Sequence, residues 1–114
     1  FTIVAQQNGP AHVIDSLLKV LAVSKNDTNK AIVLLTLANL YETNNQDSAD
    51  YYLKKGKALS EALKFEKGIF YYYQQSTVLQ YTKGNYSKAL EESNKGAENG
   101  QKDEGYRKDY HYAE

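Results

Sequence analysis

Apolar side chains recur along this chain at the spacing of an α-helix. In the segment AHVIDSLLKVLAV, one stripe of the expected helix carries Val13, Leu17, Leu18 and Leu21. No segment alternates apolar and polar residues with the period of two that is typical of a strand. The pattern therefore predicts an all-α protein.

Short polar stretches divide the helical pattern into separate segments. The stretch SKNDTNK precedes one apolar segment, and Asp27 or Thr28 is the expected N-cap there. The stretch TNNQDSAD interrupts the pattern again, with Asp47 or Ser48 as the expected cap of the next helix. Pro10 suits the first turn of the first helix, where its missing amide hydrogen is not needed.

The chain repeats itself at a distance of forty residues. Residues 41–59 and 81–99 share five identities, which is several times the number expected by chance. The identical pairs are Tyr41 and Tyr81, Asn45 and Asn85, Ala49 and Ala89, Lys55 and Lys95, and Gly56 and Gly96. We therefore expect two helical hairpins of one kind, stacked in series as an α-solenoid.

The repeated small residues indicate close helix packing. Gly56 and Gly96 fall inside expected helices, where Gly costs about 1 kcal/mol relative to Ala. Its presence at both positions suggests that another helix backbone passes close by; a coincidence of two glycines is the alternative. Ala49 and Ala89 lie two turns earlier on the same face, so each second helix carries a small-residue stripe against its partner.

The segment YTKGNYSKALEESNKG resembles the signature of the tetratricopeptide repeat (TPR) family. The matching positions are Tyr81, Gly84, Asn85, Tyr86, Ala89 and Gly96. The first copy, YETNNQDSADYYLKKG, departs from the signature, because Asn44 and Gln46 replace the Gly and Tyr of the turn. Taken together, the repeat and the resemblance imply packing roles for Tyr41, Ala49, Gly56, Tyr81, Gly84, Tyr86, Ala89 and Gly96.

The resemblance also implies a domain organisation of about six helices. A single domain over residues 10–114 would contain a capping helix at 10–24, a first repeat at 28–64, a second repeat at 66–99, and the first helix of a truncated third repeat at 101–114. Residues 1–9 are expected to be disordered or the remnant of a signal peptide, because the apolar stretch FTIVA ends on a small residue.

In TPR proteins the first helix of each pair lines an inner groove that binds peptides. The resemblance places aromatic and amide side chains of the second copy toward such a groove, together with two residues of the first copy. The implied groove residues are Tyr71, Gln74, Gln75, Val78, Ala38 and Glu42. This set contains no cation, so we expect recognition by stacking and amide hydrogen bonds and no carboxylate clamp.

Composition narrows the range of functions. The chain has 114 residues, 25% of them charged, and a formal net charge of zero, which argues against nucleic acid or an anionic membrane as the main partner. No segment approaches the roughly 18 apolar residues of a membrane span. Cysteine is absent, and His12 and His111 stand alone near opposite ends. We therefore expect no catalytic residue, no cofactor and no metal.

The expected function is a module that binds a protein or peptide. More narrowly, the chain is similar to the N-terminal TPR segments of bacterial sensor histidine kinases and related regulators. That similarity implies a periplasmic or extracytoplasmic location in a membrane-anchored signalling protein, with a cytoplasmic location as the alternative. A structural spacer, a homodimer formed through residues 101–114, and the accessory region of an enzyme are the other functions that remain open.

Overall fold

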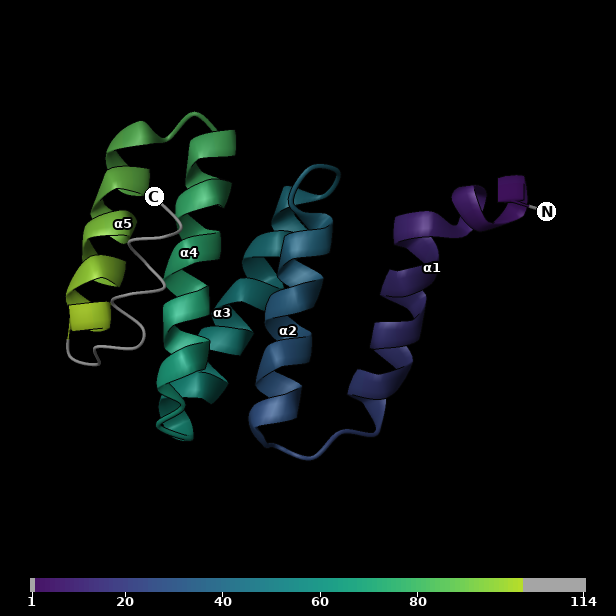
Figure 1. Ribbon diagram of the computed structural model, residues 1–114, viewed down its shortest axis with the longest axis horizontal. Helices are drawn as coiled ribbons and strands as arrows, with labels where there is room; N and C mark the ends of the chain where they lie inside the picture. Colours follow the sequence, from purple (N-terminus) through teal and green to yellow (C-terminus); the bar gives the residue numbers. More distant parts are fainter. Residues whose placement is uncertain (1, 102–114) are drawn as a thin grey trace.

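The computed structural model describes the backbone of residues 2–101 and the side chains of residues 11–99. Residues 2–101 form five α-helices and contain no strand, which confirms the all-α class (Figure 1). The helices are α1 (Thr2–Ala22), α2 (Thr28–Tyr41), α3 (Gln46–Ala62), α4 (Glu66–Thr82) and α5 (Tyr86–Gln101). The sixth helix, expected at 101–114, lies outside the described residues except for Gln101, which ends α5.

Helices that follow one another in the chain also lie against one another. α2 contacts α3, and α4 contacts α5, so the helices form two contacting pairs. α4 joins the pairs because it packs on both α2 and α3. α1 contacts α2 and lies at one end of the row of helices, with α5 at the other end (Figure 1).

α1 begins at Thr2 and not at Pro10, so the expected start of the first helix is wrong. Pro10 lies within the helix, where it cannot donate a main-chain hydrogen bond, and Figure 1 shows α1 bent in its N-terminal part. Residues 2–9 are helical, in place of the disorder that was one interpretation of residues 1–9. The other interpretation, a signal-peptide remnant, stays a prediction.

Side-chain caps begin α2 and α3. The Asp27 carboxylate accepts a hydrogen bond from the Lys30 amide at 3.0 Å, which confirms this residue as an N-cap. α3 is capped by Asn45, whose Oδ1 accepts from the Ser48 amide at 3.1 Å, so the expectation of Asp47 or Ser48 is wrong. The cap falls earlier because the turn after α2 is short and α3 starts at once.

α4 ends in a Schellman motif. The Asn85 amide donates to the Gln80 carbonyl at 2.8 Å, and the Gly84 amide donates to the Tyr81 carbonyl at 3.0 Å. Gly84 has a φ of +84°, a conformation that favours glycine. The Gly-Asn turn of the sequence thus serves both to end α4 and to start α5.

α3 ends in the same motif without a glycine. The Phe65 amide donates to the Ser60 carbonyl at 2.8 Å, and the Lys64 amide donates to the Glu61 carbonyl at 3.1 Å. Lys64 therefore occupies the left-handed position, with a φ of +55°. A side chain with a Cβ is strained in this conformation, so the α3–α4 turn is less favourable than the α4–α5 turn.

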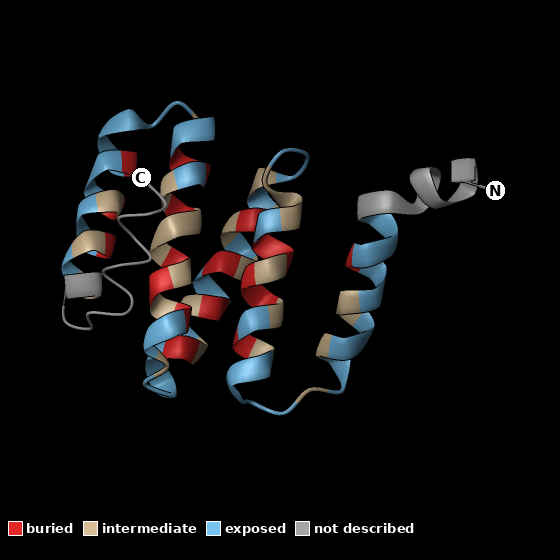
Figure 2. Ribbon diagram, in the orientation of Figure 1, coloured by how far each residue is buried: buried red, intermediate tan, exposed pale blue. Residues whose placement is uncertain are grey.

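The hydrophobic core lies where α2, α3 and α4 meet. Its central cluster consists of Leu35, Ala38, Ala49, Leu53, Tyr72 and Leu79. Figure 2 shows the buried residues on the facing sides of these three helices, whereas α1 is mostly exposed. α1 contributes Ile14 to the buried set and leaves Val13 and Val20 nearly half exposed.

Gly56 allows α3 to lie close to α2. A Cβ at this position would lie 2.6 Å from Leu35 Cδ2 and 2.7 Å from Leu35 Cγ, closer than real carbon contacts allow. Leu35 is itself only 1% exposed, so it has little room to move. Ala49, two turns earlier on α3, is also buried, as are the corresponding residues Ala89 and Gly96 on α5.

The two Schellman turns predict opposite effects for two substitutions. Lys64→Gly should raise the free energy of unfolding by about 1 kcal/mol because it relieves a strained left-handed residue. Gly84→Ala should lower it by about the same amount, although a Cβ there would meet no atom within 4 Å. Urea denaturation of the two variants measures both effects. Destabilisation by Lys64→Gly would contradict the turn geometry.

Candidate functional site

The implied groove residues of the second copy lie on one helix, α4. Tyr71, Gln74 and Gln75 are half-buried, and Val78 is 48% exposed. The Lys67 ammonium lies 5.7 Å from the centre of the Tyr71 ring, one turn earlier on the same helix. α4 thus presents a partly exposed stripe of aromatic, amide and aliphatic side chains.

The implied groove residues of the first copy are less accessible. Ala38 is only 3% exposed and belongs to the core, so its placement in a groove is wrong. It is covered because α4 packs directly on this part of α2. Its neighbour Asn39 is exposed, and the repeat register gave no reason to choose it. Glu42 is half-buried and accepts a hydrogen bond from Thr82 Oγ1 at 3.1 Å.

A small cavity of about 10 Å³ lies where α2, α3 and α4 meet. Its lining consists of Ala38, Asn39, Glu42, Leu53, Gln75 and Leu79. Gln75 Oε1 is buried and has no hydrogen-bond partner among the described residues. An unpaired buried acceptor costs roughly 1–3 kcal/mol, so this amide has a strong tendency to accept a hydrogen bond.

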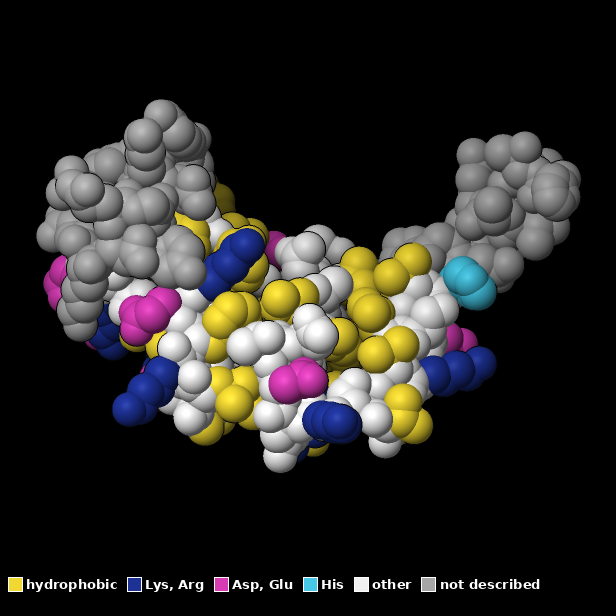
Figure 3. All heavy atoms as spheres, turned by 60° about the horizontal axis from the view of Figure 1, so that its bottom comes forward, with side chains coloured by type: hydrophobic (Ala, Val, Ile, Leu, Met, Phe, Trp, Pro, Cys, Tyr) yellow, Lys and Arg dark blue, Asp and Glu magenta, His cyan; other side chains and the backbone are white. Residues whose placement is uncertain are grey.

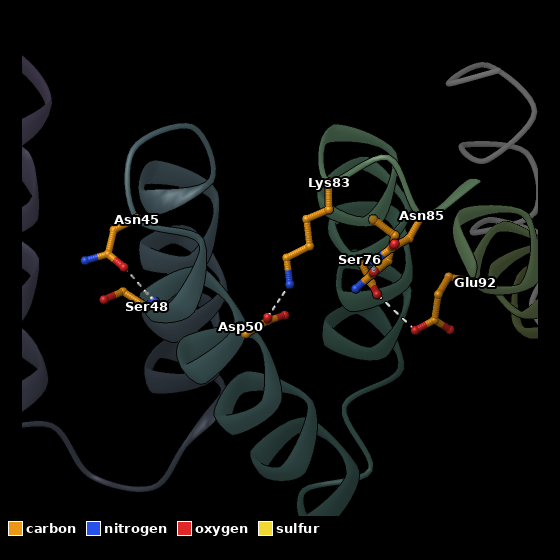
Figure 4. A network of polar contacts seen from close by, with 8 residues as sticks. Asn45, Ser48, Asp50, Ser76, Lys83, Asn85 and Glu92 are labelled. Atoms are coloured by element: carbon orange, nitrogen blue, oxygen red, sulfur yellow. Dashed lines mark hydrogen bonds and ion pairs between the residues drawn. The ribbon is translucent and has the colours of Figure 1, made fainter. Parts of the chain in front are cut away.

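An ion pair holds α4 to α3 near this cavity. The Lys83 ammonium, just past the end of α4, pairs with the Asp50 carboxylate of α3 (Figure 4). Both side chains are partly buried, which reduces screening by solvent. Together with the hydrogen bond between Thr82 and Glu42, this pair fixes the C-terminal end of α4 against the first helix pair.

A buried polar cluster lies between α4 and α5. The Tyr72 hydroxyl donates to Glu92 Oε1 at 3.2 Å. The Ser76 hydroxyl donates to the same oxygen at 2.9 Å (Figure 4). Burial raises the pKa of Tyr72 to about 12; Ser76 opposes this shift and Glu92 adds to it. The Lys57 ammonium of α3 lies 4.9 Å from the Tyr72 ring centre. Glu92 therefore has a structural role, because its carboxylate accepts hydrogen bonds from two residues of α4.

Tyr81 and Tyr86, for which the repeat implies packing roles, lie at the α4–α5 turn and outside the hydrophobic core. Their rings contact each other at 5.2 Å, but the residues are 65% and 63% exposed. Tyr41, the counterpart of Tyr81, is stacked on Tyr52 at 5.7 Å. Forty residues after Tyr52 the chain has Glu92, which is engaged in the polar cluster, so Tyr81 lacks the corresponding stacking partner.

An open apolar groove of 460 Å³ adjoins these two tyrosines. Its lining consists of Thr77, Tyr81, Tyr86, Ala89, Leu90 and Ser93. Leu90 is 64% exposed. Within residues 2–101 no helix covers this side of the α4–α5 pair in the way that α4 covers the α2–α3 pair.

Clusters of metal-ligating side chains and membrane-spanning helices are both absent from the described part of the chain. Its side chains include no group of three or more metal-ligating residues of the His, Cys, Asp or Glu type, and His12 is exposed. None of its helices is long and apolar enough to cross a membrane.

Comparison with models of protein families, with curated proteins and with solved structures finds no match for this chain.

The buried hydroxyl of Tyr72 predicts a loss of stability at alkaline pH. Its pKa is higher in the folded state than the ordinary value of 10.0, so the stabilisation is complete below pH 10. It decreases as the pH rises toward 12, by about 1.4 kcal/mol per pH unit. Urea denaturation at pH 9 and pH 11 should show this decrease, and Tyr72→Phe should reduce it. The matched control is Tyr81→Phe, which should leave it unchanged; an unchanged decrease in Tyr72→Phe would contradict the assignment.

Proposed function

We propose that this chain is a TPR-type helical-repeat module that binds a peptide along α2 and α4. Support for the repeat comes from the start of α3 at Gln46 and of α5 at Tyr86, forty residues apart. The two copies share small residues that are all buried, namely Ala49 and Gly56 in the first copy and Ala89 and Gly96 in the second. The proposal includes a role as the recognition region of a larger signalling protein.

The observation that carries the proposal is the stripe of Tyr71, Gln74 and Val78 beside α2. These side chains are one turn or nearly one turn apart on α4, and none of them is fully buried. Asn39 adds an exposed amide from α2. An extended peptide has main-chain donors and acceptors that side-chain amides can pair, while its side chains gain area on a tyrosine ring and a valine.

Gln75 favours binding of a hydrogen-bond donor at this surface. Its carbonyl oxygen is buried and has no partner within the described part of the chain, and rotation of the amide toward a peptide N–H would remove that penalty. The surrounding charge is nearly balanced, because Glu42 and Lys67 bring one charge of each sign. A peptide with neutral polar and aromatic side chains therefore fits this surface better than a strongly charged one. Figure 3 shows one face of the molecule, on which apolar side chains are intermixed with isolated charges of both signs.

A display screen of random peptides against the immobilised protein tests this function. Peptides that are enriched should bind Tyr71→Ala and Gln74→Ala about tenfold more weakly than the unaltered chain, because each change removes a contact of roughly 1–1.5 kcal/mol. Circular dichroism melting curves show whether the variants remain folded. The matched controls are Tyr81→Ala, on the open groove, and Asn94→Ala, on the exposed side of α5.

If Tyr71→Ala and Gln74→Ala bind the enriched peptides as tightly as the two control variants do, the α2–α4 surface is ruled out as the binding site. A screen that enriches no peptide would favour the alternative of a structural spacer or a dimerisation segment. The exposed groove at Tyr81, Tyr86 and Leu90 would then be the first surface to examine for self-association.

A further inference from the structure

A second large cavity, of 480 Å³, lies between α1, α2 and α3, away from the proposed peptide surface. Leu21 of α1 and Leu34 of α2 form part of its apolar wall, and Tyr51 and Tyr52 of α3 add two aromatic rings. This volume lies in the range of about 300–1,000 Å³ that is typical of small-molecule sites. The cavity is open to solvent, and it is large enough to hold the apolar body of a small organic ligand against its walls.

The polar lining of this cavity is positively charged. Lys30 and Lys55 line it, and none of the residues that the structure describes brings a carboxylate to the lining. The Lys30 ammonium donates to Asn26 Oδ1 at 2.9 Å, which is a neutral partner. The nearby Asp27 carboxylate is engaged as the cap of α2 through the Lys30 amide. The cavity thus combines positive charge with apolar walls in a chain whose net charge is zero.

Among the side chains of residues 11–99, Lys55 likewise has no acidic partner. Its ammonium lies 5.2 Å from the centre of the Tyr51 ring, and the ion pairs of the described residues involve other lysines. Burial raises the pKa of Tyr52, with contributions from Tyr41 and Tyr51, and Lys55 opposes the shift. The Tyr52 hydroxyl therefore stays protonated at neutral pH and can donate a hydrogen bond.

We propose that this cavity binds a small organic carboxylate with an aromatic or aliphatic body. The carboxylate pairs with the ammonium groups of Lys30 and Lys55, and the body lies against Leu21, Leu34 and the tyrosine rings. Hydrogen bonds between charged groups are about twice as strong as neutral ones, so the negative charge is the main determinant of affinity. This site is independent of the peptide surface on α2 and α4.

Titration of the full chain with 2-naphthoate, followed by ¹H–¹⁵N NMR spectra, tests the site. The amide signals of Lys30, Tyr51, Tyr52 and Lys55 should shift together and saturate. The neutral isostere 2-naphthamide should bind at least about fivefold more weakly, because it lacks the charge that the lysines recognise. Lys55→Gln should weaken naphthoate binding about five- to tenfold and leave naphthamide binding unchanged.

Lys88→Gln is the matched control, since Lys88 is an exposed lysine of α5. It should leave naphthoate binding unchanged. The spectrum of each variant also reports whether the fold is intact. Equal affinity for naphthoate and naphthamide would overturn the proposal. So would an equal effect of Lys88→Gln and Lys55→Gln, or shifts confined to the groove at Tyr81 and Leu90.

Discussion

The contact between Gly56 of α3 and Leu35 of α2 is the constraint on which the rest of the structure depends. It places the backbone of α3 against the side chain of Leu35, which is almost fully buried. Only with α2 and α3 this close do Ala49 and Leu53 join the core cluster, on which α4 packs. The α2–α4 surface therefore exists because a glycine stands in the middle of a different helix.

Much of the fold could be predicted from the sequence, because helix periodicity and small residues are local signals. The helical segments, the cap at Asp27 and the break at Gly84 all followed from residues close in the chain. The cap at Asn45 and the left-handed conformation of Lys64 were not predicted. Both arise from how short the turns are, and turn length depends on the packing of the helices they connect.

The candidate site could be predicted only in part. The register correctly grouped Tyr71, Gln74 and Val78 on one helix, because that grouping depends on helix geometry alone. Ala38 was assigned wrongly because its exposure depends on which helix covers it. The charged cavity at Lys30 and Lys55 was missed because α1, α2 and α3 all contribute to it, and helix patterning does not show how consecutive helices pack.

A double-mutant cycle between Gly56 and Leu35 tests the central contact most directly. In the unaltered chain, Gly56→Ala introduces overpacking of roughly 1–3 kcal/mol, partly offset by about 1 kcal/mol of helix propensity. In the Leu35→Ala background the space is free, so Gly56→Ala should become neutral or stabilising, with a coupling free energy of at least about 1 kcal/mol. Urea denaturation of the four proteins measures this coupling. Additivity within about 0.5 kcal/mol would contradict the account, because it would mean that Gly56 and Leu35 are not in contact.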